Sequence, residues 1–417
     1  MKAEIISVGT ELLLGDIVNT NARYISRELA KLGIEVYKQI TVGDNEDRLY
    51  DTFEESLKRS DLVVTTGGLG PTTDDLTKEV AAKFFNQELV LHEHSWERIQ
   101  DRMGKLTKNI TPNNKKQAYF PESAVVLDND MGTAPAAILK KDGKAIIILP
   151  GPPFEMQPLF EKEVIPYLKN FTKDKLVSKT LRLYGIGESA LETQIIDIIE
   201  EQTNPTIALY AKQMEVTIRI TAKSETEEEA YRLIAPVEER IRDRVGEFVY
   251  TDSDSYNGES KDVLEEVVAR LLVEKGLTIS TAESCTGGLV AASLVNYSGI
   301  SQVFLEGCVT YSNGAKMKRL GVSKDTLDKF GAVSEETARE MAEGISKSSG
   351  TDIGLATTGV AGPDGGSDEK PVGLVYTAIF YKGKTKVMKN NYSGDRQRIR
   401  TRATKDLLDA LRKELMK

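Results

Sequence analysis

The sequence is poor in cysteine, histidine and tryptophan, with two, two and one of these among 417 residues. The cysteines, Cys285 and Cys308, are too few for a disulfide framework or a four-cysteine zinc site. Long hydrophobic runs are missing too, since none approaches the ~18–20 residues that span a bilayer. The N-terminus carries charge where a secretory signal peptide is apolar. We therefore expect a cytoplasmic protein without a membrane partner, in which both cysteines are small buried residues.

Positive charge is in deficit, because 55 Lys and Arg residues face 64 Asp and Glu residues and leave a net charge of −9. Such a molecule lacks the overall positive field of a protein that wraps nucleic acid. We expect no direct nucleic-acid partner. At about 150 residues per domain, the length predicts two or three domains.

The first 170 residues alternate strand and helix patterns. Strands are predicted at Ala3–Val8, Glu35–Val42, Asp61–Thr66 and Ala145–Leu149, and helices at Asn19–Leu32 and Asp44–Lys58. This alternation predicts an α/β domain with a mostly parallel sheet that is covered on both faces. Ligands in such sheets bind at the carboxyl ends of the strands.

The pattern changes between residues 171 and 252, where half-exposed strands (Thr180–Tyr184, Glu215–Thr221) accompany charged helices (Glu188–Gln202, Glu225–Val245). We interpret this stretch as a small α+β connector. The polar segment Thr251–Ser260 has the composition of a linker. A further α/β domain is predicted over residues 258–417.

A glycine-rich loop follows the predicted strand Asp61–Thr66. Its glycines, Gly67, Gly68 and Gly70, let backbone N–H groups approach an anion, and the next helix offers its positive N-terminus. Asp74 and Asp75 are suited to hold a hydrated divalent cation beside a phosphate. An ordinary helix N-cap is the alternative interpretation.

Two more polar loops follow strands in the same domain. One, residues 9–21, supplies Glu11 and Asn21; the other, Leu149–Met156, is a rigid, proline-rich turn into a helix. Three such loops at one sheet edge predict a binding site there.

In the last domain, a predicted strand at Thr278–Thr281 runs into the sequence AESCTGG and then a helix from about Leu289. Ser284 at this turn is a candidate nucleophile. The amides near Gly287 and Gly288, or those of the Thr358–Gly359 turn, are candidate oxyanion donors. Neither histidine lies in this domain, so a Ser–Lys pair is the more economical mechanism, with Lys316 as the candidate base.

Three neighbouring residue groups are candidates to assist this pair. Tyr311 lies just before Lys316, Thr358 and Gly359 lie in a loop that also contains Gly362, and Arg396 is suited to bind a phosphate or carboxylate. Each also has a structural interpretation: a helix cap for Ser284, a solvated helix residue for Lys316, a surface ion pair for Arg396.

The N-terminal motifs SVGTELLLGDIVNTNA, TTGGLGPTTDDLTKE and LPGPPFEM resemble the first domain of the CinA (competence/damage-inducible) family, whose fold is similar to that of molybdopterin-binding proteins. The resemblance covers residues 1–170 and implies a functional Asp at Asp75. It also implies hydrolysis of ADP-ribose to AMP and ribose 5-phosphate with a divalent metal ion, Mg²⁺ or Co²⁺. Molybdopterin proteins usually carry Thr where this chain has Leu69, which disfavours molybdopterin as the ligand.

The C-terminal motifs AESCTGG, YSNGAK, TGVAGPDGG and YSGDR resemble the last domain of the same family. This resemblance implies deamidation of nicotinamide mononucleotide to nicotinate mononucleotide and ammonia, without a cofactor. It implies Ser284 as nucleophile, Lys316 as base, Tyr311 and Thr358 as helpers, and Arg396 near the substrate. The connector is similar to a KH fold but lacks the GXXG spacing of an RNA clamp.

Our leading hypothesis is therefore a bifunctional, homodimeric hydrolase in pyridine-nucleotide salvage. A molybdopterin-handling protein and a non-enzymatic adaptor in competence or DNA repair are the alternatives.

Overall fold

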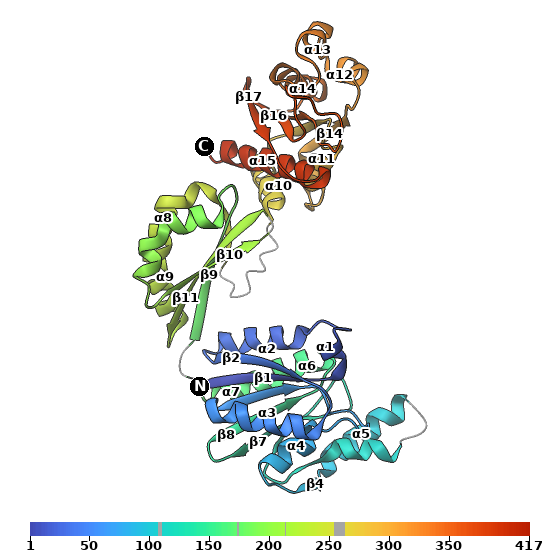
Figure 1. The fold of residues 1–417 in the computed structure, drawn as a ribbon, viewed down its shortest axis with the longest axis vertical. Coiled ribbons are helices and arrows are strands. Elements are labelled where there is room, and N and C mark those ends of the chain that lie inside the picture. The colour runs from blue at the N-terminus through green and yellow to red at the C-terminus, as the bar shows by residue number, and fades with distance from the viewer. Residues whose placement is uncertain (107–110, 173–174, 213, 254–262) are drawn as a thin grey trace. The chain divides into compact units, whose positions relative to one another are not determined.

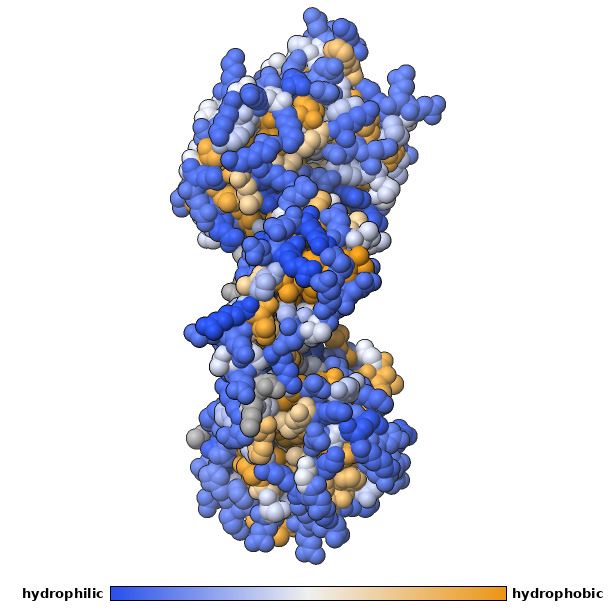
Figure 2. Space-filling model, turned by 90° about the vertical axis from the view of Figure 1, so that its left-hand side faces the viewer, coloured by the Kyte–Doolittle hydropathy of each residue, from blue (hydrophilic) through white to orange (hydrophobic). Residues whose placement is uncertain are grey.

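A computed structural model describes residues 1–106, 111–172, 175–212, 214–253 and 263–417 (Figure 1). They form two compact units, Met1–Ser178 with Thr221–Ile234 and Lys179–Ile220 with Ala235–Lys417. Helices and strands mix in every part, so the predicted multi-domain α/β class is confirmed. The face shown in Figure 2 is mostly hydrophilic with scattered hydrophobic patches. Over the described ranges, no helix is both long and apolar enough to cross a membrane.

The N-terminal sheet has six strands in the order β2-β1-β3-β8-β7-β6. Their bounds are β1 Lys2–Val8, β2 Glu35–Val42, β3 Leu62–Thr66, β6 Val125–Leu127, β7 Ala136–Lys141 and β8 Lys144–Leu149. The first four in this order are parallel, whereas β7 and β6 are antiparallel to their neighbours. The mostly parallel sheet is thus confirmed, with an antiparallel edge.

Helices cover both faces of this sheet because alternate strand residues point to opposite sides. Ile5 packs with α2 (Thr20–Lys31), α6 (Pro153–Leu159) and the following turns, whereas Ile6 packs with α3 (Glu46–Arg59) and α4 (Thr77–Phe84). The remaining elements are α1 Thr10–Leu14, β4 Leu89–Leu91, α5 Glu93–Leu106, η1 Pro112–Ala118, β5 Tyr119–Pro121, η2 Phe160–Val164 and α7 Ile165–Lys169.

The connector has a four-stranded sheet in the order β10-β11-β9-β12. Its elements are β9 Lys175–Leu183, α8 Glu188–Glu200, β10 Thr206–Lys212, β11 Glu215–Ser224, α9 Glu227–Val245, η3 Gly246–Phe248 and β12 Val249–Ser253. The prediction that the linker starts at Thr251 is wrong, because Thr251–Ser253 pair antiparallel with β9. The rest of the predicted linker, residues 254–260, lies outside the described residues.

The C-terminal sheet has the order β14-β13-β15-β16-β17, with the first three strands parallel and the last two antiparallel. The strands are β13 Ile279–Glu283, β14 Phe304–Val309, β15 Ile353–Gly359, β16 Leu374–Tyr381 and β17 Lys384–Asn391. The helices are α10 Leu264–Lys275, α11 Leu289–Val295, η4 Ile300–Gln302, α12 Asn313–Leu320, α13 Lys324–Phe330, α14 Glu335–Ser349 and α15 Arg396–Leu415. Figure 1 shows α10, α11 and α15 together on one side of this sheet.

The end of the connector packs into the core beside α15. Tyr184 and Tyr250 join the hydrophobic cluster of α10 and α15. Arg412, only 2% exposed, donates to the carbonyls of Val249 (3.1 Å) and Glu247 (2.9 Å). This buried contact ties the start of β12 to the last domain.

Candidate functional sites

A cavity of about 600 Å³ lies at the carboxyl ends of the N-terminal strands. It is lined by all three loops singled out from the sequence, and by every predicted residue of this site: Glu11, Asn21, Gly67, Gly68, Gly70, Asp74 and Asp75. The loops meet because parallel strands end at one sheet edge. Asn21 links them directly, since its amide donates to Thr66 Oγ1 (2.8 Å) and to the carbonyl of Gly151 (2.6 Å).

The turn that carries Asp75 is held by hydrogen bonds within the turn and by Lys116. The Asp75 carboxylate accepts from the backbone N–H of Thr72 at 2.9 Å and from the Thr72 hydroxyl. Lys116 donates to the carbonyls of Thr72 (3.0 Å) and Asp75 (2.5 Å). The hydrogen bond from Thr72, the backbone and the charge of Lys116 lower the pKa of Asp74.

Three glycines of the first loop are required by close packing. A Cβ at Gly67 would lie 2.1 Å from the Val8 carbonyl, one at Gly68 would lie 2.2 Å from Thr77 Oγ1, and one at Gly70 would lie 2.4 Å from Asp75. Gly67 and Gly68 also have φ of +103° and +68°. These glycines therefore shape the cavity whether or not their amides contact a ligand.

The cavity wall is acidic. Glu11, Asp44, Asp74, Asp75 and Glu155 line it, and its described lining includes no Lys, Arg or His. Oxygen donors of this kind fit a hard divalent cation such as Mg²⁺. No group of three or more His, Cys, Asp or Glu side chains within the described parts is arranged to bind a metal, so water and substrate would have to complete the coordination.

The second site lies in the C-terminal domain, where Ser284 follows β13 and Lys316 lies in the first turn of α12. Lys316 Nζ donates to Ser284 Oγ at 3.1 Å and to the Thr310 carbonyl at 2.9 Å. Ser312 caps this helix, because its hydroxyl accepts a hydrogen bond from the Ala315 amide at 3.1 Å. This cap fixes the start of the helix and therefore the backbone position of Lys316. The predicted Ser–Lys pair is in hydrogen-bonding contact.

Lys316 is 1% exposed, and burial lowers the pKa of its ammonium because the charged form is poorly solvated there. The surface interpretation of Lys316 is therefore wrong. Cys285 beside it is also buried, and burial raises the pKa of its thiol to about 11. Cys285 is thus the small buried residue that the sequence predicts, whereas Cys308 is only half-buried.

Arg396 contacts the two other predicted loops, which contain Tyr311 and Gly362. Its guanidinium donates to the carbonyl of Gly362 (2.7 Å) and to the Tyr311 hydroxyl (3.1 Å). Tyr311 is 63% exposed, so the Arg396–Tyr311 pair lies at the surface of the site rather than beside the buried amine. Lys316 itself is held by Thr310.

Thr358 and Gly359 lie in β15 rather than in the turn predicted for them. The Thr358 hydroxyl donates to the Ala332 carbonyl at 2.6 Å. A Cβ at Gly359 would lie 2.6 Å from the Leu374 carbonyl, so close packing against β16 requires the glycine. Both residues thus have structural partners.

The sequence predicts oxyanion donors near Gly287 and Gly288, and the amides of these two glycines are already bonded to other groups. Gly287 N–H donates to the Ser284 carbonyl (3.1 Å), and Gly288 N–H donates to the Glu283 carboxylate (2.9 Å). Both glycines instead supply left-handed backbone, with φ of +62° and +95°.

The amides of Cys285 and Thr286 follow Ser284 directly. Neither is bonded to a carbonyl or side-chain oxygen within the described residues. Both bond to the Cys285 thiol and lower its pKa against the larger effect of burial. Since a thiol is a weak acceptor, these two N–H groups are candidate oxyanion donors.

Sequence reasoning missed two charged residues at this turn, Glu283 and Arg400. Glu283 is 1% exposed and precedes the candidate nucleophile Ser284, while Arg400 contacts the Thr286 carbonyl from α15. A carboxylate inside a buried strand was the available signal for Glu283. No local signal distinguishes Arg400 from the other arginines of α15.

Three family models match consecutive parts of the chain: "Probable molybdopterin binding domain" over residues 4–170, "Damage-inducible protein CinA KH domain" over 178–251 and "CinA C-terminal domain" over 261–415. A "Putative competence-damage inducible protein" of Clostridioides difficile is 65% identical over 417 residues, with all of both chains covered. The chain belongs to the CinA family. The predicted resemblance is confirmed.

Other proteins are also similar to this chain. A "CinA-like protein" of Kosmotoga olearia is 58% identical over 416 residues, covering 100% of this chain and 99% of that protein. Among solved structures, "the protein CinA with unknown function" from Thermoplasma acidophilum is 40% identical over 39% of this chain and 97% of its own, with a TM-score of 0.37.

Proposed function

We propose that the C-terminal domain hydrolyses the carboxamide of nicotinamide mononucleotide to the carboxylate and ammonia. The observation that carries this proposal is the 3.1 Å hydrogen bond between the Lys316 amine and the Ser284 hydroxyl in a buried environment. An unactivated amide needs a strong nucleophile, and a serine with a neutral amine beside it provides one. The four CinA motifs in the same domain support the nucleotide as substrate.

In the first half-reaction, Ser284 Oγ bonds to the amide carbon while its proton passes to Lys316 Nζ. The amides of Cys285 and Thr286 stabilise the oxyanion; one donor of this kind is worth on the order of 10²–10³ in rate. The carbon–nitrogen bond then breaks as Lys316 returns the proton to the departing nitrogen. Ammonia leaves, and an acyl ester remains on Ser284.

In the second half-reaction, water attacks the ester carbon and gives a proton to Lys316. The carbon–Oγ bond breaks, the same proton restores the Ser284 hydroxyl, and the product ionises to the carboxylate. The contact of Arg396 with Tyr311 at the surface supports a role for this exposed pair in binding the anionic part of the nucleotide.

For the N-terminal domain, the acidic cavity and the family resemblance support hydrolysis of the ADP-ribose pyrophosphate. An anionic pyrophosphate is repelled by five carboxylates, so it needs accompanying positive charge. A divalent cation supplies that charge and Lewis acidity when bound. Thr72 and Lys116 hold the Asp75 turn in place through hydrogen bonds to its carboxylate and carbonyls.

A direct test measures ammonia release from nicotinamide mononucleotide by the purified full-length chain, and AMP release from ADP-ribose with and without Mg²⁺. We expect both products, with only the second reaction requiring the cation. Absence of ammonia at all pH values from 6 to 10 would reject the deamidase assignment, and cation-independent AMP release would reject the N-terminal assignment.

A further inference from the structure

Arg400 forms a two-pronged contact with the turn that follows the nucleophile. Its Nε and Nη2 donate to the Thr286 carbonyl at 3.2 and 2.6 Å, across 114 residues of sequence. A Cβ at Gly287 would lie 3.4 Å from Nη2, so the guanidinium lies directly against this turn. A fork of two N–H donors on one oxygen fixes the carbonyl direction more firmly than one bond does.

The opposite side of the same turn is fixed by Glu283. Its carboxylate accepts from the Thr286 hydroxyl (2.7 Å) and from the amides of Gly288 (2.9 Å), Val290 (3.1 Å) and Ala291 (2.8 Å). The Thr286 hydroxyl also lies 2.6 Å from Thr357 Oγ1. Both the carbonyl and the side chain of Thr286 are therefore held.

We propose that Arg400 is a positioning residue for the oxyanion donors, with Glu283 as its counterpart. Arg400 holds the Thr286 carbonyl and Glu283 holds its hydroxyl, so Thr286 is anchored two residues after Ser284. This anchor limits the backbone conformations of the residues between, and with them the positions of the Cys285 and Thr286 amides. Glu283 occupies the amides of Gly288, Val290 and Ala291, which leaves Cys285 and Thr286 as the donors that we propose. The inference rests on the proposed acyl-transfer chemistry but not on the identity of the amide substrate.

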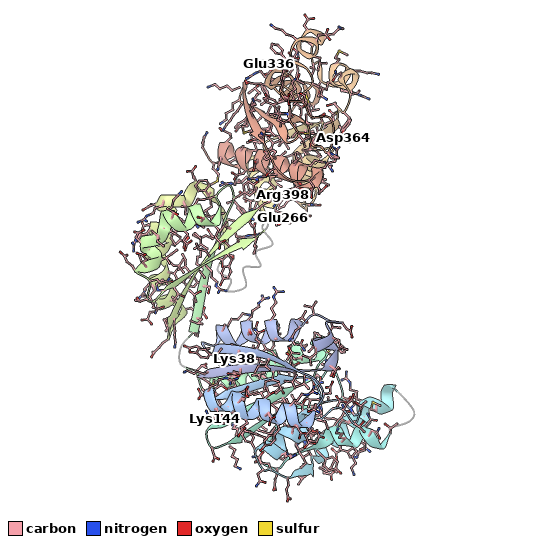
Figure 3. All side chains as sticks on the ribbon, viewed as in Figure 1. Lys38, Lys144, Glu266, Glu336, Asp364 and Arg398 are labelled. Carbon is pink, nitrogen blue, oxygen red and sulfur yellow. The ribbon has the colours of Figure 1, made fainter. Side chains whose placement is uncertain are left out.

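The test compares Arg400→Gln and Arg400→Lys with the matched control Arg398→Gln. Arg398 lies on the same helix, is exposed, and is labelled in Figure 3. The first readout is the kcat and KM of ammonia release. The second is the rate at which a fluorophosphonate modifies Ser284: the Oγ–phosphorus bond forms, the phosphorus–fluorine bond breaks, fluoride leaves and the serine proton passes to Lys316.

We expect Arg400→Gln to lower kcat and the labelling rate by about 10²-fold, the cost of losing one oxyanion donor, with KM within threefold. Arg400→Lys keeps one donor to the carbonyl and is expected to fall between Gln and wild type. Arg398→Gln should match wild type in both readouts. If Arg400→Gln does not fold, the Arg400→Lys and Arg398→Gln comparison still decides the question.

Two results would overturn the inference. A rise in KM with unchanged kcat and labelling would make Arg400 a substrate-binding residue, and unchanged values throughout would leave it with no part in the reaction. Failure of the proposed function looks different: wild type would be labelled at Ser284, and Arg400→Gln would slow that labelling, without ammonia release from nicotinamide mononucleotide.

Discussion

Replacing Lys316 by Met tests the base most sharply, because Met keeps the length and apolar stem of the side chain and removes only the amine. Lys316 makes two hydrogen bonds, to Ser284 Oγ at 3.1 Å and to the Thr310 carbonyl at 2.9 Å. Lys316 is 1% exposed, so the Met side chain would occupy a buried position. The variant therefore loses the proton acceptor for attack and the donor for the departing nitrogen.

The size of the loss follows from these two roles. One general acid–base step is worth about 10²–10⁴ in rate, so we expect kcat for deamidation to fall by at least ~10³, or about 4 kcal/mol of transition-state stabilisation at 1.36 kcal/mol per tenfold. The free energy of unfolding should change less than the activation free energy of deamidation. The unpaired Thr310 carbonyl costs about 1–3 kcal/mol, which the removal of a buried amine partly offsets.

The assay is steady-state ammonia release, and the control is Lys318→Met on the exposed face of the same helix. The pH profile gives an independent check. Only the neutral amine accepts a proton, so wild-type kcat/KM rises with pH through the pKa of Lys316, which burial places below its ordinary value. A folded Lys316→Met protein within tenfold of wild type would refute this reasoning.

Further predictions concern other parts of the chain. Ser284→Ala should lower deamidation by several orders of magnitude, and the Ser284→Ala, Lys316→Met double variant should be little worse, because the pair acts as a unit. Asp75→Asn or a chelator should reduce AMP release from ADP-ribose at least ~10²-fold and leave ammonia release unchanged; equal turnover in the Asn variant would count against a metal at Asp75. Arg412→Met should destabilise the chain by about 1–3 kcal/mol in denaturant unfolding, because the buried carbonyls of Val249 and Glu247 lose their donor while Asp409 keeps Lys413 at 3.0 Å; an unchanged midpoint would show that this contact is not stabilising. A fragment of residues 258–417 should release ammonia but melt below the full chain, since it lacks the carbonyls that Arg412 binds; a fragment that folds and is inactive would show that the site needs other parts of the chain.

Local sequence patterns predicted most of the framework well. The strand Glu35–Val42 and the start of α11 at Leu289 match the structure to the residue, because alternation and glycine stops are local signals. The end of the connector was harder to predict. Thr251–Ser253 is polar enough for a linker, yet its backbone pairs with β9, and such pairing depends on a partner some 70 residues earlier in the chain.

The sequence motifs predicted the candidate reacting groups of the site but not the residues that hold them in place. The motifs pointed to Ser284 and Lys316 as a pair. Which backbone amides are already hydrogen-bonded depends on contacts between distant residues, which no local pattern reveals. Glu283 takes the Gly288 amide and Arg400 takes the Thr286 carbonyl. Both contacts support our proposal that the oxyanion donors are the Cys285 and Thr286 amides, which directly follow Ser284.

The central claim is that Ser284 forms a covalent acyl intermediate during amide hydrolysis. The most direct measurement mixes the full-length protein with excess nicotinamide mononucleotide, quenches it in acid within milliseconds and determines the mass of the peptide that contains Ser284. The account predicts a transient mass increase equal to the nucleotide acyl group, located on Ser284 and absent in Ser284→Ala. Ammonia release at the wild-type rate by a folded Ser284→Ala protein, with no adduct in either protein, would contradict it and leave direct attack by water as the mechanism.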